Sequence, residues 1–324
     1  MQSFEYANPA SLQEAVALLA PKWGQADVLA GGTDLISCMK EHLHTPKRVV
    51  NIKNIKELEG ISKTADGLRI GALVTMDDLA RSPDVKGEFK SLAEAAGGIP
   101  SPQIRHMGTV GGDLCQRPRC WYFRNGMGLL GMKDGKSLVP EGENQYHSIF
   151  GDGPAYFVSA SSLGPALVAL NAKVKLVGPK GPREVPVASF FVVPKDEASR
   201  EIALQPNEIL TEIIVPNGAT HSATYEVRQK EALDWPLAAA SVAITMKGNV
   251  VGSARVVMGH VAATPWHSAA ADKALVGKPI TTATAEAAAK AAVADAKPLS
   301  QNAYKVTLAR TAVKRALLDA VKKA

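Results

Sequence analysis

Two short glycine-rich stretches constrain the fold of this chain more than any other feature of its sequence. The first is Val28-Leu-Ala-Gly-Gly-Thr-Asp-Leu-Ile36, and the second is Gly108-Thr-Val-Gly-Gly-Asp-Leu114. Each pairs adjacent glycines with a threonine and an aspartate at the end of an apolar run. Consecutive glycines let the backbone approach a ligand closely, and successive N–H groups in such a turn form a nest for phosphate oxygens. Two such loops predict a ligand with two phosphates.

A plainer interpretation of either loop alone is a tight strand-to-helix turn in which Asp34 caps the following helix. The repetition of the pattern favours the phosphate-binding interpretation. The chain has no Gly-x-x-x-x-Gly-Lys-Ser/Thr motif, and its one Gly-x-Gly-x-x-Gly spacing, from Gly126 to Gly131, does not lie between a predicted strand and a predicted helix. The Rossmann and P-loop solutions to phosphate binding are therefore not expected here.

Several motifs, in order along the chain, point to one family. Ala30-Gly-Gly-Thr-Asp-Leu35 and Arg105-x-x-Gly-Thr-Val-Gly-Gly-Asp113 resemble the FAD-binding (medium) subunit of molybdenum hydroxylases. That family includes carbon monoxide dehydrogenase, xanthine dehydrogenase and bacterial aldehyde oxidoreductases. The resemblance covers the whole length, because three further landmarks match: Phe4-x-Tyr-x-x-Pro-x-Ser-Leu-x-Glu-Ala15, Glu208-Ile-Leu-Thr-Glu-Ile-Ile-Val-Pro216 and Gly259-His-Val-Ala-Ala-Thr-Pro-Trp266.

The resemblance implies an α+β protein. It has a two-part α/β FAD-binding domain of the vanillyl-alcohol-oxidase-like, non-Rossmann type, followed by an antiparallel sheet domain with helices on one face. We expect the FAD-binding domain over residues 1–177, with subdomains of about 1–55 and 56–177. Residues 178–324 would form the C-terminal domain of the CO dehydrogenase flavoprotein type.

Local patterns agree with this order of elements. Helices are predicted over 11–20, with Ser11 and Glu14 as a capping box, over 34–41, from Thr75, and over 89–96. Strands are predicted over 28–30, 48–52 and 67–74. From about residue 174 the texture changes to successive strands followed by helices, which fits a sheet covered by helices. The later expected strands are 174–177, 209–215, 240–246 and 253–258, and the later helices are 282–296 and 303–322.

The family resemblance implies that both loops wrap the pyrophosphate and ribityl chain of FAD. Backbone N–H groups of residues 31–35 and 109–113 would donate, and the Thr33 and Thr109 hydroxyls would add donors. Asp34 and Asp113 would repel a phosphate, so we expect them to cap a following helix or to accept from ribityl or ribose hydroxyls. No catalytic side chain and no metal ligand are expected. The predicted FAD-binding residues are Leu29, Ala30, Gly31, Gly32, Thr33, Asp34, Leu35, Gly71, Gly108, Thr109, Gly111, Gly112, Asp113, Ser162, Leu210 and Lys230.

Two positions depart from the family pattern. Ser162 stands where many members have an acidic flavin contact, within Ser161-Ser-Leu-Gly-Pro165. Val227 stands where the family often has a lysine near the flavin, and Arg228 or Lys230 are the candidates to replace it.

The segment from Cys115 to Pro154 has little periodicity, and a run of this length inside a domain is usually functional. Its start resembles a loop that adds a four-iron cluster in aldehyde oxidoreductase flavin subunits. Such a cluster needs four thiolates, whereas the segment offers only Cys115 and Cys120, with His147 as a further soft ligand. We therefore expect no cluster. The segment would instead cover the flavin or meet a partner through Arg117, Arg119, Trp121 and Tyr122.

The chain is basic, with 37 Lys and Arg against 31 Asp and Glu and a formal charge of +6. These cations are dispersed or lie on the C-terminal helix, where they suit the helix dipole, so no nucleic-acid partner is expected. No apolar run approaches the roughly 20 residues that span a bilayer. Because the first residues do not resemble a secretory signal, we expect a cytoplasmic protein, or else periplasmic export with a signal-bearing partner.

The resemblance implies an oxidoreductase subunit that carries electrons. A molybdenum-cofactor large subunit would oxidise the substrate, and a two-iron ferredoxin-like small subunit would relay electrons through FAD to an external acceptor. The histidines and serines form no catalytic triad, which suits this role. Two alternatives remain open: a self-sufficient flavin oxidase with its own substrate pocket, and a scaffold subunit that has lost FAD.

Overall fold

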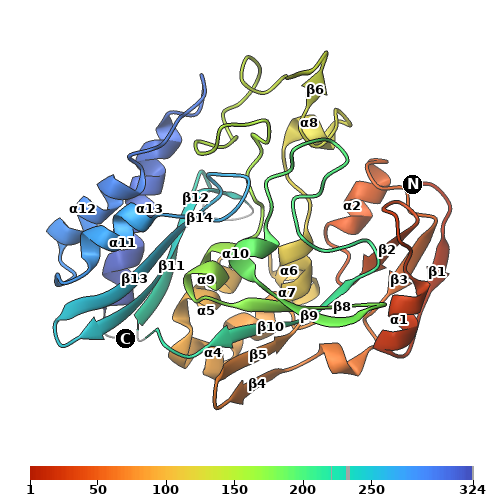
Figure 1. The fold of residues 1–324 in the computed structure, drawn as a ribbon, viewed down its shortest axis with the longest axis horizontal. Coiled ribbons are helices and arrows are strands. Elements are labelled where there is room, and N and C mark those ends of the chain that lie inside the picture. Colours follow the sequence, from red (N-terminus) through yellow and green to blue (C-terminus); the bar gives the residue numbers. More distant parts are fainter. Residues whose placement is uncertain (220, 231–233, 323–324) are drawn as a thin grey trace.

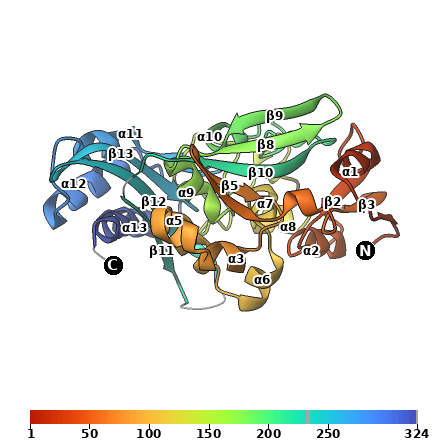
Figure 2. The same ribbon diagram turned by 90° about the horizontal axis from the view of Figure 1, so that it is seen from below.

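The computed structural model describes residues 1–219, 221–230 and 234–322. Along its longest axis, a small N-terminal unit lies at one end and the C-terminal domain at the other (Figure 1). A five-stranded sheet and its helices lie between them (Figures 1 and 2). The mixed α and β architecture expected from the sequence is confirmed.

The N-terminal unit is a three-stranded parallel sheet in the order β1-β3-β2. Ser11 begins the first helix as expected, since its hydroxyl accepts from the N–H of Glu14 at 3.3 Å. Ala15 and Val50 lie in the small core under this sheet. The elements are β1 (Glu5–Ala7), α1 (Leu12–Leu18), β2 (Ala26–Leu29), α2 (Leu35–Lys40) and β3 (Arg48–Asn51).

The middle unit is an antiparallel sheet in the order β4-β5-β10-β8-β9. Its core continues into the helices that pack on it, with Ile70 and Ile213 fully buried on neighbouring strands. Thr75 caps the first of these helices through the N–H of Asp78. The elements before the long segment are η1 (Lys56–Leu58), β4 (Ile61–Thr64), β5 (Gly67–Gly71), α3 (Met76–Arg81), α4 (Pro83–Glu88), α5 (Lys90–Gly97), α6 (Pro102–Met107) and α7 (Val110–Cys115). Those after it are α9 (Leu163–Ala169), β8 (Lys173–Gly178), β9 (Gly181–Pro186), α10 (Val187–Phe190) and β10 (Ile209–Pro216).

This sheet changes where the domains divide. The sequence led us to place the strand near 209–215 in the second domain, but β10 pairs with both β5 and β8. A boundary at residue 177 would separate β8 from β9 and β10, its two partners in the sheet. We propose that the boundary lies near residue 220, which keeps the sheet whole.

The C-terminal domain is an antiparallel sheet in the order β11-β12-β13-β14 with three helices on its outer face (Figure 1). Alternate residues of β12, such as Val242 and Ile244, pack toward these helices, while Ala243 faces the middle unit. One face of α12, with Ala285, Ala288, Ala289 and Ala292, is buried as a packing stripe, as expected for a plain helix. The elements are β11 (His221–Arg228), β12 (Pro236–Lys247), β13 (Val250–Gly259), β14 (Trp266–His267), α11 (Ala269–Leu275), α12 (Thr282–Ala292) and α13 (Tyr304–Ala320).

The segment from Cys115 to Pro154 projects beyond the two sheets (Figure 1). It holds α8 (Trp121–Arg124) and the short hairpin β6 (Met132–Lys133) and β7 (Lys136–Ser137). It is not structureless, because Phe123 and Leu130 form a small core with Phe157. The buried Lys305 ammonium on α13 anchors it by donating to the carbonyls of Tyr146, His147 and His260 at 3.1, 3.0 and 2.8 Å.

No helix in the described part of the chain is long and apolar enough to cross a membrane.

Candidate functional site

The first glycine loop connects β2 to α2 and leaves its backbone donors free. Gly32 has a φ of +75°, a left-handed conformation that favours glycine. The Gly32 carbonyl accepts from the N–H of Ile36 at 3.1 Å. Among the described residues, no acceptor pairs with the N–H groups of Gly31 to Leu35. The loop is therefore a nest of unpaired donors, which is the arrangement that binds phosphate oxygens.

In the second loop, which runs from the end of α6 into α7, most backbone N–H groups already donate hydrogen bonds within the protein. The N–H groups of Val110 and Gly111 donate to the carbonyls of Val74 and Ala72, both at 2.9 Å. Those of Gly112 and Asp113 donate to the hydroxyl and carbonyl of Thr109. Contrary to the expectation from sequence, the backbone from 110 to 113 already forms hydrogen bonds within the protein, so it offers no free nest.

The two loops touch each other. A Cβ placed on Gly31 would lie 1.8 Å from the carbonyl oxygen of Met107, at the end of α6. One on Gly108 would lie 3.7 Å from the hydroxyl of Thr33. Gly31 is therefore required for the close approach of the two backbones, in addition to any role in binding a ligand.

A cavity of about 380 Å³ opens beside the loops, where the N-terminal unit, the middle unit and the start of β12 meet. This volume is in the range of small-molecule sites, roughly 300–1,000 Å³. Most of the predicted residues line it: Ala30, Gly31, Gly32, Thr33, Asp34, Leu35, Gly108, Thr109, Gly112, Asp113 and Ser162.

Five predicted residues lie outside the cavity wall: Leu29, Gly71, Gly111, Leu210 and Lys230. The two glycines among them serve packing, because a Cβ on Gly71 would lie 2.3 Å from the Leu58 carbonyl oxygen and one on Gly111 would lie 2.9 Å from the Ala72 Cβ. Leu210 is buried in the core of the middle unit. Lys230 is exposed just beyond the end of β11.

Arg228, and not Val227 or Lys230, faces the cavity. Side chains alternate along a strand, so Val227 packs against the core of the C-terminal domain while Arg228 points the other way. The Arg228 guanidinium pairs with Glu226 and donates to the carbonyl of Gly98. Burial raises the pKa of Glu226 to about 7, although Arg228 opposes the shift.

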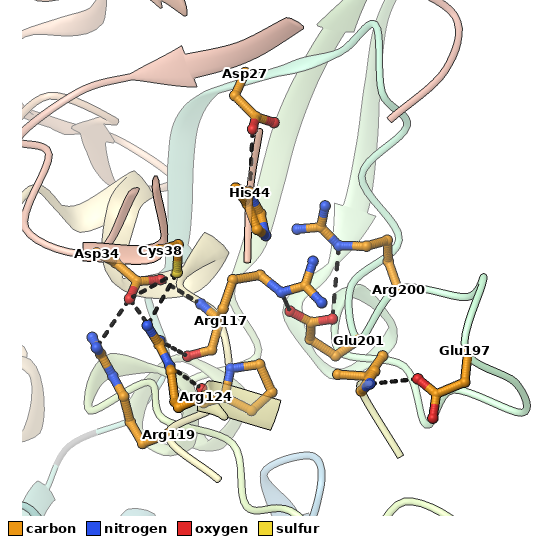
Figure 3. A network of polar contacts seen from close by, with 12 residues as sticks. Asp27, Asp34, Cys38, His44, Arg117, Arg119, Arg124, Glu197, Arg200 and Glu201 are labelled. Carbon is orange, nitrogen blue, oxygen red and sulfur yellow. Dashed lines mark hydrogen bonds and ion pairs between the residues drawn. The ribbon is translucent and has the colours of Figure 1, made fainter. Parts of the chain in front are cut away.

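One role that the sequence led us to expect for Asp34 is capping of α2, but its side chain makes no capping hydrogen bond there. Its carboxylate instead accepts from the N–H of Arg117 at 2.7 Å and pairs with Arg124 and Arg119 at 2.8 and 3.0 Å (Figure 3). Burial raises the pKa of this carboxyl, but Arg119 and Arg124 outweigh burial and hold the pKa below its usual range. The charge of these two arginines, with the Arg117 N–H as a further donor, explains why the side chain turns away from the helix end.

Asp113 lies within α7 and binds the start of a later helix, so it does not cap the helix that directly follows its loop. Its carboxylate accepts from the hydroxyl of Ser161, the N–H groups of Ser162 and Leu163, and the amide of Gln116. It therefore holds the start of α9, which follows Ser162, against α7. Burial raises the pKa of Asp113 even though these hydrogen bonds favour its charged form.

Sequence reasoning missed the arginine and tryptophan pairs of the cavity wall. Arg200 stacks on Trp23 and Arg119 on Trp235, with guanidinium-to-ring distances of 4.1 and 4.6 Å. Arg200 and Arg117 share Glu201 (Figure 3). The arginine and the tryptophan of each stacked pair lie far apart in the chain, so no local spacing could have revealed them.

The cysteines are all free. Cys120 Sγ lies 3.1 Å from His147 Nε2, and burial raises the pKa of Cys115 to about 12. Among the described residues, no three His, Cys, Asp or Glu side chains come together in a way that could hold a metal ion.

Comparison with known proteins gives the same assignment as the loops. Residues 2–218 match the family described as the FAD binding domain in molybdopterin dehydrogenase. Residues 223–320 match the CO dehydrogenase flavoprotein C-terminal domain. The chain therefore belongs to the family of FAD-binding subunits of molybdopterin dehydrogenases.

Individual relatives cover nearly the whole chain. The carbon monoxide dehydrogenase medium chain of Hydrogenophaga pseudoflava is 33% identical, over 97% of this chain and 96% of that protein. The aldehyde oxidoreductase FAD-binding subunit PaoB of Escherichia coli (strain K12) is 31% identical, over 99% of both chains. A solved structure of carbon monoxide dehydrogenase from Hydrogenophaga pseudoflava aligns with a TM-score of 0.76 at 32% identity, covering 98% of this chain and 97% of that one.

The chain is thus an oxidoreductase flavoprotein subunit whose cofactor is FAD. The residues present fit this cofactor. The first loop supplies unpaired N–H donors next to the cavity, and two arginines of the wall, Arg119 and Arg228, each have a buried Nε with no hydrogen-bond partner among the described residues. Buried donors of this kind call for an acceptor, which the phosphates and ring carbonyls of FAD would supply.

Proposed function

We propose that this subunit passes electrons from the iron–sulfur clusters of a partner subunit through FAD to an external acceptor. In this proposal it assembles with a molybdenum-cofactor large subunit, which oxidises the organic substrate, and with a two-iron ferredoxin-like small subunit. The family membership and the whole-length likeness to medium chains support the proposal.

The single observation that carries the proposal is the free donor nest of Gly31 to Leu35 at the cavity wall. We assign the FAD diphosphate to this nest, with the Thr33 hydroxyl as a further donor. The Thr109 hydroxyl oxygen already accepts from Gly112, so its O–H remains free to donate to the same group. When bound, FAD supplies the redox chemistry, and the protein supplies binding, orientation and electrostatics.

The remaining wall residues have supporting roles in this proposal. Arg228 places a positive charge at the cavity, and the buried Glu226 partly balances that charge. Ser162 offers an uncharged hydroxyl at the wall. None of these groups forms a paired acid and base for substrate chemistry, which suits a subunit that relays electrons.

The test uses the purified full chain. It should bind FAD noncovalently and in equimolar amount, giving a flavin absorption spectrum that is lost when the bound FAD is removed by denaturation. With aldehydes or purines and a dye acceptor, the isolated chain should give no turnover until the molybdenum and iron–sulfur subunits are added.

Two outcomes would overturn the proposal. Reduction of the bound flavin by an organic substrate in the isolated chain would favour a self-sufficient flavin oxidase. A purified chain that binds no FAD at micromolar concentration would instead favour a scaffold role.

A further inference from the structure

The long segment after the second loop delivers one arginine to the first loop. Arg119 Nη1 lies 3.0 Å from Asp34 Oδ1, and Asp34 is itself part of the nest. The guanidinium stacks on Trp235 and donates to the side chain of Gln116 at 3.0 Å. Arg119 therefore bridges the N-terminal unit and the C-terminal domain across the cavity wall.

Arg119 still has unused capacity to donate. Its Nε is buried without a hydrogen-bond partner among the described residues, and the side chain lines the cavity. A buried donor without an acceptor is unfavourable. A ligand oxygen arriving in the cavity would remove that penalty.

Arg124 is a natural comparison, because it binds the same oxygen of Asp34 (Figure 3). The Nη2 that binds Asp34 also donates to the Arg117 carbonyl, while Nε donates to the Pro118 carbonyl and Nη1 contacts the Cys38 sulfur. Every nitrogen of Arg124 has a partner, and the side chain does not line the cavity. Of the two arginines on Asp34, only Arg119 is available to a ligand.

The charges also leave room for an anion. Asp34 serves both Arg119 and Arg124, Glu201 serves both Arg117 and Arg200, and Glu41 lies 3.9 Å from Arg124. Four guanidinium groups therefore face three carboxylates on this side of the cavity, which leaves an excess of positive charge. A diphosphate carries two negative charges and would balance it.

We propose that Arg119 binds the diphosphate of FAD together with the nest, and so selects the dinucleotide over flavins that lack this group. The proposal rests on the FAD-binding role argued above. The binding site would then include the segment from Cys115 to Pro154, whose arginine completes it, in addition to the two glycine loops.

The test compares FAD and ADP affinities of the full apo chain with those of R119Q. Losing a hydrogen bond to a charged group weakens binding by about 10- to 100-fold. We expect this loss for FAD and equally for ADP, which carries the diphosphate without the flavin. The apo melting temperature should change little, because Asp34 keeps Arg124 and the Arg119 side chain is 29% exposed.

Two further variants make the result specific. R124Q should lower the apo melting temperature while the folded protein keeps its FAD affinity, and R69Q controls for the loss of one surface charge. Should R119Q fold poorly, R119K preserves the charge without the fork and should weaken FAD binding less than tenfold, with a steeper dependence on salt than wild type.

Wild-type affinity for FAD in R119Q, or a loss for FAD without a loss for ADP, would overturn the assignment of Arg119 to the diphosphate. In both cases the wild-type chain still binds FAD, so the proposed function would stand. Absence of FAD binding by the wild-type chain would remove the proposed function and this inference together.

Discussion

The two glycine loops have nearly the same residues and different roles. In the first, Gly31 to Leu35 keep their N–H groups free beside the cavity, whereas in the second the N–H groups of Val110 to Asp113 are bound within the protein. The difference comes from what surrounds each loop. The second lies against the turn after β5, where Ala72 and Val74 provide carbonyl acceptors. The same motif can therefore form a ligand cradle or an internal brace.

The aspartates of the loops show the same division. Asp34 faces arginines, which stabilise its charge, while Asp113 faces neutral donors in a buried position. The environment lowers the pKa of the first carboxyl and raises that of the second. The first loop is an electrostatic site and the second a packing site, and this comparison can be tested residue by residue.

The largest effect is expected from G31A. A Cβ at this position would lie 1.8 Å from the Met107 carbonyl oxygen, so the backbone of one loop must move. We expect the free energy of unfolding to fall by at least about 3 kcal/mol, with loss of FAD binding. The matched variant G111A meets Ala72 Cβ at 2.9 Å and should lose only about 1 kcal/mol. Urea unfolding and FAD titration measure both.

In G111A the folded protein should retain its FAD affinity, because the Gly111 N–H already donates to Ala72. G87A is the control, since a Cβ there meets no atom within 4 Å and alanine favours the helix. If G111A lost FAD affinity while remaining folded, the second loop would be a ligand site after all, and the distinction between the loops would fail.

The sequence allowed prediction of the features that depend on local pattern. The helix that begins after Ser11 and the helix that begins after Thr75 follow from their caps, and the turns of both loops follow from paired glycines. The domain boundary did not follow, because the pairing of β10 with β5 joins residues about 140 positions apart. Long-range pairing leaves little trace in the spacing of residues.

The same limit applies to the site. Its glycines and threonines could be located from the motif, but the fate of their N–H groups depends on carbonyls from other elements. The arginine partners of Asp34 come from a segment about 85 residues later. A single sequence shows that the segment is rich in arginine without showing which arginine reaches the loop.

The next largest effect is expected from D34N, which tests the electrostatic role of the first loop. The change removes the carboxylate that Arg119 and Arg124 share, in a site where the Asp34 side chain is 15% exposed, and leaves Arg124 only Glu41 at 3.9 Å. Breaking a buried ion pair from one side is unfavourable by about 3 kcal/mol. D152N, which removes an exposed pair with Lys297, should leave stability nearly unchanged. Urea unfolding at pH 7 compares them, and equal stability of D34N and wild type would contradict the electrostatic role.

The smallest effect is a pH dependence of opposite sign at the two loops. The folded pKa of Asp34 is lowered, so its contribution to stability is present above the unfolded pKa of about 3.9 and is lost as the pH falls below it. The folded pKa of Asp113 is raised, so its contribution is greatest below about pH 3.9 and is lost as the pH rises through the folded value. Acidification therefore removes the stabilisation that the Asp34 charge gives the first loop, and it removes the destabilisation that the buried Asp113 charge causes at the second.

Unfolding of wild type, D34N and D113N in urea between pH 3 and 7 measures both signs. Any hydrogen bonds that D113N loses shift its free energy of unfolding by the same amount at every pH. The slope of the free energy of unfolding against pH therefore reports the titration of Asp113. Between pH 7 and 4, D113N should lose stability more steeply than wild type, because the relief from protonating Asp113 is gone. Below pH 4, D34N should lose stability less steeply than wild type. Parallel curves for all three proteins would show that both aspartates keep ordinary pKa values, and the electrostatic contrast between the loops would not hold.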